Sequence, residues 1–271
     1  MSKIHPSVGE GMSHQDMISF WDQYSECYSS MQQGDIPDRI VDRLFKLGML
    51  RKDDSVMELG SGPGTYSLRM APRLRILTCM DSSERMLVRL SKGAESMGLH
   101  NIELFCKDWS KYVPHKGYDA CIATLCPGTG SPESIERMEK TARRSCILVS
   151  WVTNHGDDLN ARVWQALGKD YGYDFRDSTV VQDYLTGIGR EPIVEFFRTG
   201  IEMDIPVEEL VKKEESAFRP YGINESIGDI VRSILEPESD GGVVYYSAEN
   251  EMKMICWNVP DPYDYVIGIQ S

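Results

Sequence analysis

The sequence of 271 residues is short of positive charge, with 29 Lys and Arg against 42 Asp and Glu and a net charge of −13. Proteins that bind nucleic acids rely on Lys and Arg to neutralise phosphates, so this deficit argues against a DNA or RNA substrate. No apolar run approaches the length that a membrane-spanning helix needs. The first residues, MSKIHPSVGEGMSHQD, also lack the apolar region of a signal peptide. We therefore expect a cytoplasmic protein with neither a nucleic-acid nor a membrane partner.

Paired cysteines are missing as well. The seven cysteines include no CxxC pair, and most of them fall inside apolar, strand-like runs. This distribution is typical of buried, reduced thiols rather than of a disulfide framework or a zinc site. We expect no metal site from these residues.

Two helices are predicted near the N-terminus. Apolar residues between Met17 and Met31 recur at spacings of three and four, which forms one stripe of a helix. A second apolar stripe begins after Pro37 and ends near Gly48, where proline and glycine favour a helix start and a helix end. We interpret residues 1–35 as an N-terminal lid helix.

Short β-rich runs alternate with helical segments through the middle of the chain. The runs are almost continuously apolar, so both faces of the strands are expected to be covered. This alternation predicts right-handed βαβ crossovers and a parallel sheet. Ser131 as N-cap and Pro132 at the first helical position mark the helix before the fifth strand. The predicted strands span residues 55–59, 75–80, 101–106, 118–125 and 145–152.

Two more β-rich runs, residues 243–247 and 252–259, flank a short polar stretch near the C-terminus, and we predict a hairpin there. The expected fold class is therefore α/β, a three-layer doubly wound sheet of seven strands with the last strand antiparallel. The segment between the fifth strand and the hairpin is too long for one crossover, so we expect an inserted α+β cap. It holds helix-like segments and the extended run PIVEFFRTGIEMDI. The predicted domains are 1–35 (lid), 36–152 (core), 153–242 (cap) and 243–271 (C-terminal hairpin).

The stretch MELGSGPGTYS, residues 57–67, puts three glycines into five positions between an apolar run and a helical one. Glycines at a strand-to-helix junction let the backbone approach a ligand where any Cβ would collide. They also aim the N–H groups of the helix start at an anionic part of that ligand. A tight turn without a ligand is the alternative.

The neighbours of this loop bear on the choice. Glu58 precedes the glycines, which gives the spacing E-x-G-x-G-x-G. Thr65 stands where the dinucleotide fingerprint G-x-G-x-x-G needs Gly or Ala, so the spacing departs from that of dehydrogenases. Asp81 closes the second predicted strand, where a carboxylate can accept both hydroxyls of a ribose. Asp81 could instead cap the helix that follows.

These motifs resemble those of the class I S-adenosylmethionine-dependent methyltransferases. MELGSGPGTYS is similar to the first motif of the family, CMDSSERML to the second, and CKDWS to the acidic position after the third strand. The resemblance covers about residues 36–152 and the final hairpin. It implies S-adenosyl-L-methionine as the cofactor and a sheet whose last strand is antiparallel, which agrees with the order of the runs.

Carried over position by position, the resemblance places the methionyl part of the cofactor against the three glycines, with Glu58 holding the loop or the ammonium group through a water. Asp81 would accept hydrogen bonds from the ribose hydroxyls, and Met86 would pack on the adenine. Asp108 would accept the adenine amino group beside Trp109, although Asp108 could cap a turn and Trp109 could belong to the core. The cofactor-binding candidates are Glu58, Gly60, Gly62, Gly64, Asp81, Ser82, Met86, Asp108, Trp109 and Leu125.

The methyl acceptor is expected at the carboxyl ends of the strands, where Thr124 is one candidate contact. His155 is the histidine nearest a predicted strand end and is the hypothetical catalytic base, with an ordinary loop histidine as the alternative. Asp157 and Asp158 could bind a divalent metal, but capping of the next helix is preferred, so we predict no metal. The substrate-contact candidates are Trp21, Tyr24, Tyr28, Cys126 and Trp151.

The resulting hypothesis is S-adenosylmethionine-dependent methyl transfer to a small-molecule acceptor enclosed between core and cap. The stretch LCPGTG, residues 125–130, does not match the Asn/Asp-Pro-Pro-aromatic motif of DNA and protein-amide amino methyltransferases. Two other functions stay open at this point. One is a non-catalytic protein that binds S-adenosylmethionine or S-adenosylhomocysteine as a regulator or partner, and the other is an NAD-dependent oxidoreductase. The sequence leaves the acceptor and the oligomeric state open.

Overall fold

The structure, a computed structural model, describes residues 14–26, 28, 33–154, 158–168, 179–223 and 225–260. The chain falls into two compact units, which we name by their main content. The sheet unit consists of Asp35–Val152, Arg176–Phe197 and Met252–Ser271. The helical unit consists of Met1–Gly34, Thr153–Phe175 and Arg198–Glu251.

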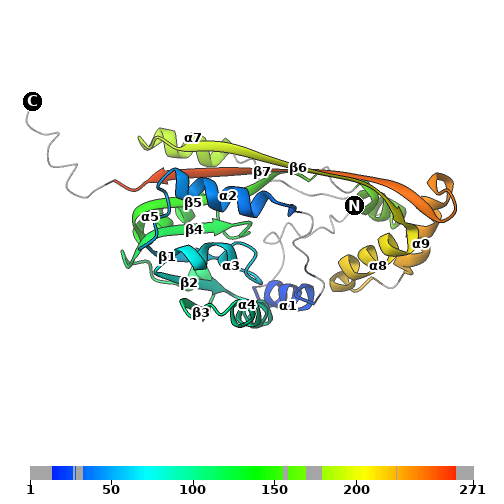
Figure 1. Ribbon diagram of the computed structural model, residues 1–271, viewed down its shortest axis with the longest axis horizontal. Coiled ribbons are helices and arrows are strands. Elements are labelled where there is room, and N and C mark those ends of the chain that lie inside the picture. The colour runs from blue at the N-terminus through cyan, green and yellow to red at the C-terminus, as the bar shows by residue number, and fades with distance from the viewer. Residues whose placement is uncertain are drawn as a thin grey trace, which may run out of the picture. The chain divides into compact units, whose positions relative to one another are not determined.

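A mixed sheet of seven strands in the order β3-β2-β1-β4-β5-β7-β6 forms the core (Figure 1). Six strands are parallel and the last is antiparallel, which confirms the predicted doubly wound α/β class. The strands are β1 (Ser55–Leu59), β2 (Ile76–Asp81), β3 (Ile102–Cys106), β4 (Tyr118–Thr124), β5 (Ala142–Asn154), β6 (Ile193–Pro206) and β7 (Val243–Asn258).

The register brings the carboxyl ends of three strands to the same level. Leu59, the last residue of β1, pairs with Met80 on β2 and with Ala123 on β4. All residues of β1 are buried, as expected for a central parallel strand covered on both faces. The residues that follow β1, β2 and β4 are therefore close together at one edge of the sheet.

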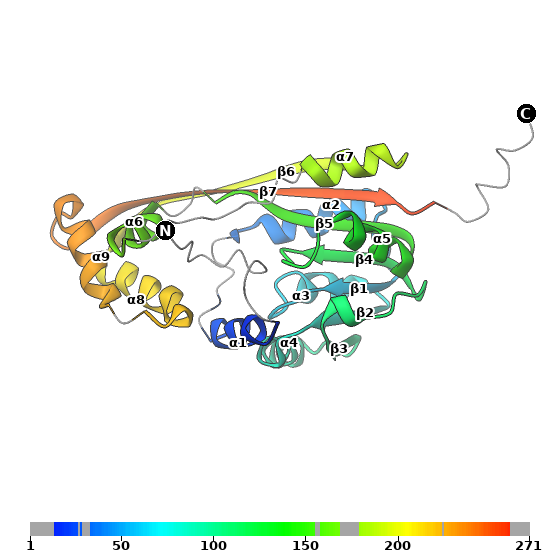
Figure 2. The same cartoon turned by 180° about the vertical axis from the view of Figure 1, so that it is seen from behind.

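Helices cover both faces of the sheet and complete the three layers. α2 (Ile36–Lys46), α3 (Ser67–Met70) and α4 (Glu84–Ser96) pack on one face, where Ile40, Leu44 and Leu77 share a buried cluster. α5 (Pro132–Thr141) and α7 (Thr179–Gly187) pack on the other, where Met57 and Ile135 are buried. In Figure 1, α2 lies in front of the sheet. In Figure 2, which views the molecule from the opposite side, α5 lies in front of the sheet.

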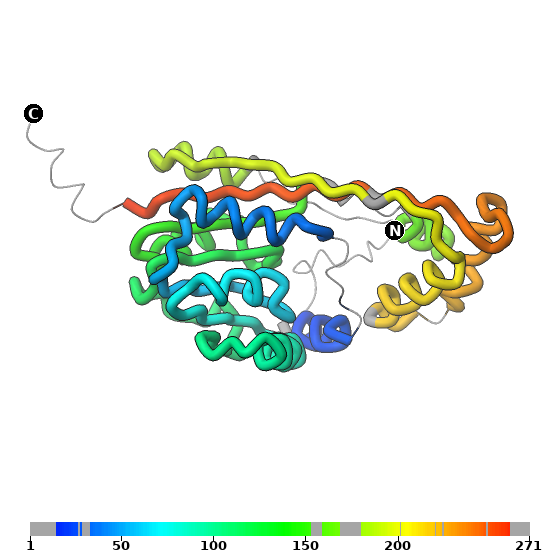
Figure 3. Tube along the Cα trace, viewed as in Figure 1, coloured from blue at the N-terminus to red at the C-terminus, as the bar shows by residue number. Residues whose placement is uncertain are grey.

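The predicted C-terminal hairpin is wrong, because β7 runs without a break through the polar stretch (Figure 3). Glu251, in that stretch, forms an ion pair with Arg198 of the neighbouring strand β6, so its charge does not force a turn. The remaining strand of the sheet, β6, is formed by the run PIVEFFRTGIEMDI, apart from its first residue, together with Pro206. This run was predicted to belong to the cap. α7, assigned to the cap as well, lies in the sheet unit.

The predicted helix ends are confirmed for two helices and wrong for a third. α2 has proline in its first turn, and Gly48 follows it with φ of +72°. α5 begins with a capping box in which Ser131 accepts from the backbone N–H of Ser134. α1 (His14–Tyr24) ends well before Met31, and the hydroxyl of Ser25 donates to a backbone carbonyl of its last turn.

The helical unit has its own apolar core. α6 (Asp158–Ala166), α8 (Val207–Phe218) and α9 (Ile227–Leu235) bury Trp164, Phe218 and Val231 together. The rings of Trp164 and Phe218 lie 4.7 Å apart between centroids.

Short 3-10 helices occur at Ala71–Arg73, Trp109–Lys111, Arg219–Tyr221 and Glu236–Glu238. None of the helices in the described part of the chain is long and apolar enough to cross a membrane.

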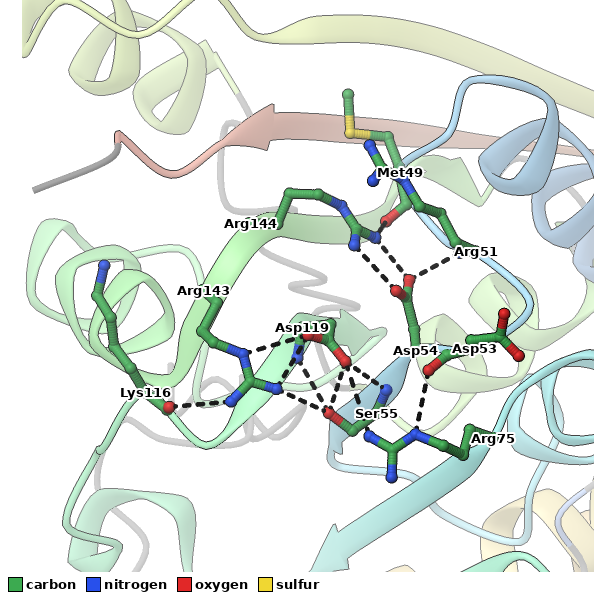
Figure 4. Close-up of polar contacts among 10 residues, drawn as sticks. All are labelled: Met49, Arg51, Asp53, Asp54, Ser55, Arg75, Lys116, Asp119, Arg143 and Arg144. Atoms are coloured by element: carbon green, nitrogen blue, oxygen red, sulfur yellow. Dashed lines mark hydrogen bonds and ion pairs between the residues drawn. The ribbon is translucent and has the colours of Figure 1, made fainter. Parts of the chain in front are cut away.

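Two arginines at the start of β5 connect the amino ends of the central strands (Figure 4). Arg143 donates to the carboxylate of Asp119 on β4 and to the hydroxyl of Ser55 on β1. Arg144 donates to both carboxylate oxygens of Asp54, at 2.9 and 2.5 Å. The side chain of Asp54 is only 6% exposed, so this second ion pair is largely shielded from solvent.

Replacement of Arg144 by Met should lower the free energy of unfolding by about 3 kcal/mol, because it leaves the carboxylate of Asp54 buried without its cation. The matched change Lys140→Met breaks an exposed helical pair with Glu136 and should cost less than about 1 kcal/mol. Urea unfolding of both variants measures the difference. Equal losses would contradict the structural role of the Arg144 pair.

Candidate functional site

The three glycines after β1 have left-handed backbones for different reasons. Their φ angles are +64° at Gly60, +52° at Gly62 and +92° at Gly64. A Cβ on Gly60 would lie 2.6 Å from Sγ of Cys126, and one on Gly64 would lie 2.9 Å from Cγ of Leu90. At Gly62 no described atom lies within 4 Å of that position. Packing therefore requires Gly60 and Gly64 to be glycine, whereas the side-chain space at Gly62 is left unfilled by the described protein atoms.

The backbone amides at the start of the loop are engaged within the protein. The N–H groups of Gly60 and Ser61 both donate to the carbonyl of Met80 at the end of β2, at 2.8 and 3.1 Å. The N–H of Gly62 donates to Oδ2 of Asp81 at 2.8 Å. These three amides therefore do not bind a ligand directly, and the expectation for the N–H groups at the start of the following helix stays a prediction. The three loop amides instead fix the shape of the loop against the neighbouring strand.

The carboxylate of Asp81 is held in place by two backbone donors. Besides the bond from Gly62, its Oδ1 accepts from the N–H of Ser83 at 2.8 Å. The N-cap of α4 is Ser83, whose hydroxyl accepts from the N–H of Met86. Asp81 is therefore not the capping residue of this helix. Its side chain instead lies between the glycine loop and the start of α4.

The carboxyl group of Glu58 joins three elements at the base of the loop. Glu58 has no solvent exposure, and it accepts from Ser67 of α3 at 2.5 Å and from Thr124 of β4 at 3.0 Å. The pKa of Glu58 is raised to about 7, chiefly by burial and in smaller part by the nearby charge of Asp81, while the hydrogen bonds from the two hydroxyls oppose the shift. Near neutral pH this carboxyl group is therefore poised between its two protonation states.

One buried hydroxyl on the loop, that of Ser61, has no hydrogen-bond partner in the described part of the chain. Oγ of Ser61 is buried, and among the described residues nothing hydrogen-bonds to it. A buried hydroxyl without a partner is costly unless a ligand or water satisfies it. Together with the unfilled space at Gly62, it fits a partly polar ligand seated against the loop. This is the fit that a cofactor with a charged amino-acid tail requires.

The candidates around the expected adenine position have structural contacts of their own. Asp108 caps a 3-10 turn, accepting from the N–H and the hydroxyl of Ser110 at 2.8 and 2.7 Å. Trp109 is buried in the cluster under α5, with the guanidinium of Arg137 5.0 Å from its ring centroid. Met86 is buried in the first turn of α4, and its neighbour Ser82 is half-buried. Their contacts with a cofactor stay predictions.

The turn after β4 is strained. Leu125 is the only non-glycine residue with positive φ among those described, at 52°, and its N–H donates to the carbonyl of Val149 on β5. Backbone strain of this kind is concentrated at functional sites. Burial raises the pKa of the neighbouring Cys126 to about 12, so its thiol is protonated at neutral pH and is not a thiolate nucleophile.

The substrate candidates are found in different places. Trp21 and Tyr24 lie in the helical unit, with ring centroids 5.7 Å apart, and Tyr24 contacts Tyr28 at 5.9 Å. Trp151 packs on the core of the sheet unit. His155 lies outside the described residues. Within those residues, no three His, Cys, Asp or Glu side chains are grouped so as to hold a metal ion.

Some residues of the site are not predictable from the sequence. Ser61 gave no signal, because a serine between glycines is common in turns and its burial depends on the packed neighbours. Leu125 stood among the cofactor candidates, but its positive φ was not predicted from an apolar residue type. Ser67 was missed as a partner of Glu58, although the hydroxyl follows the acidic residue within the same motif.

Comparison with known proteins finds likeness to methyltransferases over part of the chain. The sequence model of a methyltransferase domain matches residues 56–146. A protein from Bacillus halodurans, provisionally described as a methyltransferase, superposes with a TM-score of 0.50 at 13% identity, over 81% of this chain and 98% of that one. The likeness in structure extends well beyond the matched segment.

The relatives found by sequence include an uncharacterized protein and a ribosomal RNA methyltransferase. An uncharacterized protein of Haemophilus influenzae is 24% identical over 82% of this chain and 83% of its own length. A 23S rRNA (uracil-C5)-methyltransferase of Pseudomonas savastanoi is 29% identical, but the likeness spans 36% of this chain and 23% of that enzyme. The relative with long coverage thus gives no activity, and the one with an activity resembles only part of the chain.

The buried carboxyl group of Glu58 should make stability depend on pH. Its pKa of about 7 lies above the ordinary value of 4.5, so the unfolded chain loses this proton first as the pH rises. Relative to Glu58→Gln, the wild-type free energy of unfolding should fall by about 1.4 kcal/mol per pH unit between these two values. Urea unfolding at several pH values checks this. Parallel curves for the two proteins would contradict the raised pKa, because they would show that Glu58 has the same pKa in the native and the unfolded state.

Proposed function

We propose that this chain, a class I S-adenosylmethionine-dependent methyltransferase, transfers the methyl group of its cofactor to a small molecule. The observation that carries the proposal is the arrangement at the end of β1. Gly62 leaves its side-chain space unfilled, the hydroxyl of Ser61 lacks a described partner, and the carboxylate of Asp81 is fixed beside the same loop.

The residues of this loop suit the two ends of the cofactor. We assign the amino-acid tail to the backbone around Gly60, Gly62 and Gly64, with Ser61 as a hydrogen-bonding partner. We assign the ribose hydroxyls to Asp81, because its carboxylate is held by Gly62 and Ser83 rather than used to cap α4. Ser82, Met86, Asp108, Trp109 and Leu125 complete the proposed cofactor set.

The bound cofactor supplies an activated methyl group, so the protein mainly has to align the acceptor with it and exclude water. Alignment of this kind can lower a barrier by about 7–11 kcal/mol. Glu58 contributes by fixing the loop to α3 and β4 through Ser67 and Thr124. The strained turn at Leu125 then places its backbone at the carboxyl edge of the sheet, level with the loop.

The acidic surface supports a small-molecule acceptor. A net charge of −13 gives weak attraction for phosphate backbones, on which binding to RNA depends. RNA is nevertheless the second candidate, because the Pseudomonas enzyme named above acts on ribosomal RNA. That likeness is confined to 36% of this chain, and a shared domain does not carry its substrate with it.

The residues that contact the acceptor are assigned from the sequence. Trp21, Tyr24 and Tyr28 offer aromatic rings. Cys126 follows β4, and Trp151 lies near the carboxyl end of β5. His155 is the proposed base, which an acceptor needs only if it arrives protonated. The free thiols of the described cysteines support activity in a reducing compartment, which we take to be the cytoplasm.

Gly62→Ala tests the cofactor site with little effect on folding. The new methyl group meets no described atom, so the fold should bear only the cost of a left-handed alanine, about 1–2 kcal/mol. If the cofactor occupies that space, affinity for S-adenosylhomocysteine in calorimetry should fall at least about tenfold. Gly48→Ala is the matched control, because Gly48 also has positive φ and open space but precedes β1, whereas the loop follows the carboxyl end of that strand. Equal affinity of both variants would overturn the assignment.

The acceptor itself is identified by transfer of label. The protein is incubated with methyl-labelled S-adenosylmethionine and a cell extract that is then separated into metabolite, RNA and protein fractions. Label should enter the metabolite fraction with wild type and Gly48→Ala, and should be strongly reduced with Gly62→Ala. Label in RNA or protein would contradict the small-molecule acceptor. Binding of S-adenosylhomocysteine without any transfer would instead favour a non-catalytic binding protein.

A further inference from the structure

We propose that β3 pairs with β3 of a second copy of this chain, so that the two sheets continue across a twofold axis. This inference does not depend on the identity of the acceptor. It starts from the position of β3 at the end of the strand order, with β2 as its neighbour in the sheet. A strand in that position presents backbone groups that can pair with another chain.

β3 exposes large apolar side chains although it is an edge strand. Phe105 is 47% exposed and Leu104 is 38% exposed, although both lie in a regular strand of the core sheet. Natural sheet edges commonly avoid such side chains or cover them, because bare apolar edges associate. Large exposed apolar side chains on an edge strand therefore indicate a partner.

The parity of the backbone determines which residues face that partner. The carbonyl of Asn101 accepts from Leu77, and the N–H of Lys107 donates to Asp81, so the odd-numbered residues of β3 point their backbone groups toward β2. Backbone direction alternates along a strand. Ile102 and Leu104 therefore turn their N–H and C=O groups to the outer edge. An antiparallel partner must pair through even-numbered residues.

Several registers would pair the even-numbered residues of the two β3 strands. The charges of the side chains favour one of these registers. Glu103 and Phe105 share one face of β3, because successive side chains alternate. Lys107, the residue after the strand, continues this alternation, because its N–H still donates to the carbonyl of Asp81. If Phe105 lies opposite Phe105 of the second copy, Glu103 of each chain lies opposite Lys107 of the other. Neither Glu103 nor Lys107 has an ion-pair partner among the described residues. The face of β3 is therefore self-complementary in charge, with an aromatic pair on the axis.

This register also satisfies the backbone. Leu104 then pairs with residue 106 of the second copy in a hydrogen-bonded position, as the parity requires. The facing pairs of Glu103 with Lys107, and of the two Phe105 rings, fall at non-hydrogen-bonded positions, where cross-strand side chains are closest. Thr78 already holds the carboxylate of Glu103 along this face, through a bond of 3.2 Å. The side chain is thus oriented before association.

Charge reversal tests the register on the full-length protein. Glu103→Lys and Lys107→Glu each place like charges opposite one another twice, so each should weaken dimerisation by about tenfold or more in sedimentation velocity. The double reversal Glu103→Lys/Lys107→Glu restores opposite charges and should restore the wild-type dimer. Circular dichroism confirms that the variants fold. Monomer at all concentrations, or a dimer that the single reversals leave unchanged, would overturn the proposal.

A cross-link tests the same geometry independently of charge. Two strands at a non-hydrogen-bonded position have Cα atoms about 4.5 Å apart, within the range of a disulfide. Phe105→Cys, made in a Cys106→Ser background, should therefore give a covalent dimer on mild oxidation. Met97→Cys in the same background is the control, because Met97 is also exposed but lies at the end of α4. Equal cross-linking of the two variants would contradict the pairing.

Discussion

The carboxyl group of Glu58 has no access to solvent, and this constraint determines how the carboxyl edge of the sheet is built. A buried carboxyl group is costly unless donors satisfy it, and here the donors are Ser67 after the loop and Thr124 on the adjacent strand. The chain must therefore return to β1 within a few residues of leaving it. The glycine loop is the short path that this return allows.

The same edge collects the other features of the site. The carbonyl of Met80, at the end of β2, accepts hydrogen bonds from two loop amides, and the carboxylate of Asp81 accepts one from a third. The loop therefore cannot move without breaking hydrogen bonds to β2. Leu125 holds a strained backbone where β4 ends. Charged residues at the opposite, amino edge are instead paired with one another, as Arg143 is with Asp119. Stabilising ion pairs and the candidate site thus occupy different edges of one sheet.

Much of the fold follows from local patterns in the sequence. The central strands were predictable because parallel strands covered on both faces must be almost wholly apolar. The C-terminal hairpin was not, because the polarity of Glu251 looks like a turn until its partner Arg198 on β6 is known. β6 was missed as a sheet strand for a related reason, since its run lies among helices and only tertiary pairing joins it to β7.

The candidate site was predictable where residue type alone determines the role. Glycines needed for positive φ and an acidic residue at a strand end carry their signal in the sequence, as Gly60 and Asp81 show. The strain at Leu125 depends on how neighbouring elements pack. So do the space at Gly62 and the hydroxyl of Ser61, which no described residue fills or hydrogen-bonds. No pattern along the chain encodes them.

A crystal structure of the protein with S-adenosylhomocysteine tests the central claim most directly. We expect a ligand atom in van der Waals contact with the backbone of Gly62, and both ribose hydroxyls within hydrogen-bonding distance of the Asp81 carboxylate. A ligand bound elsewhere on the chain, with the space at Gly62 empty, would contradict it.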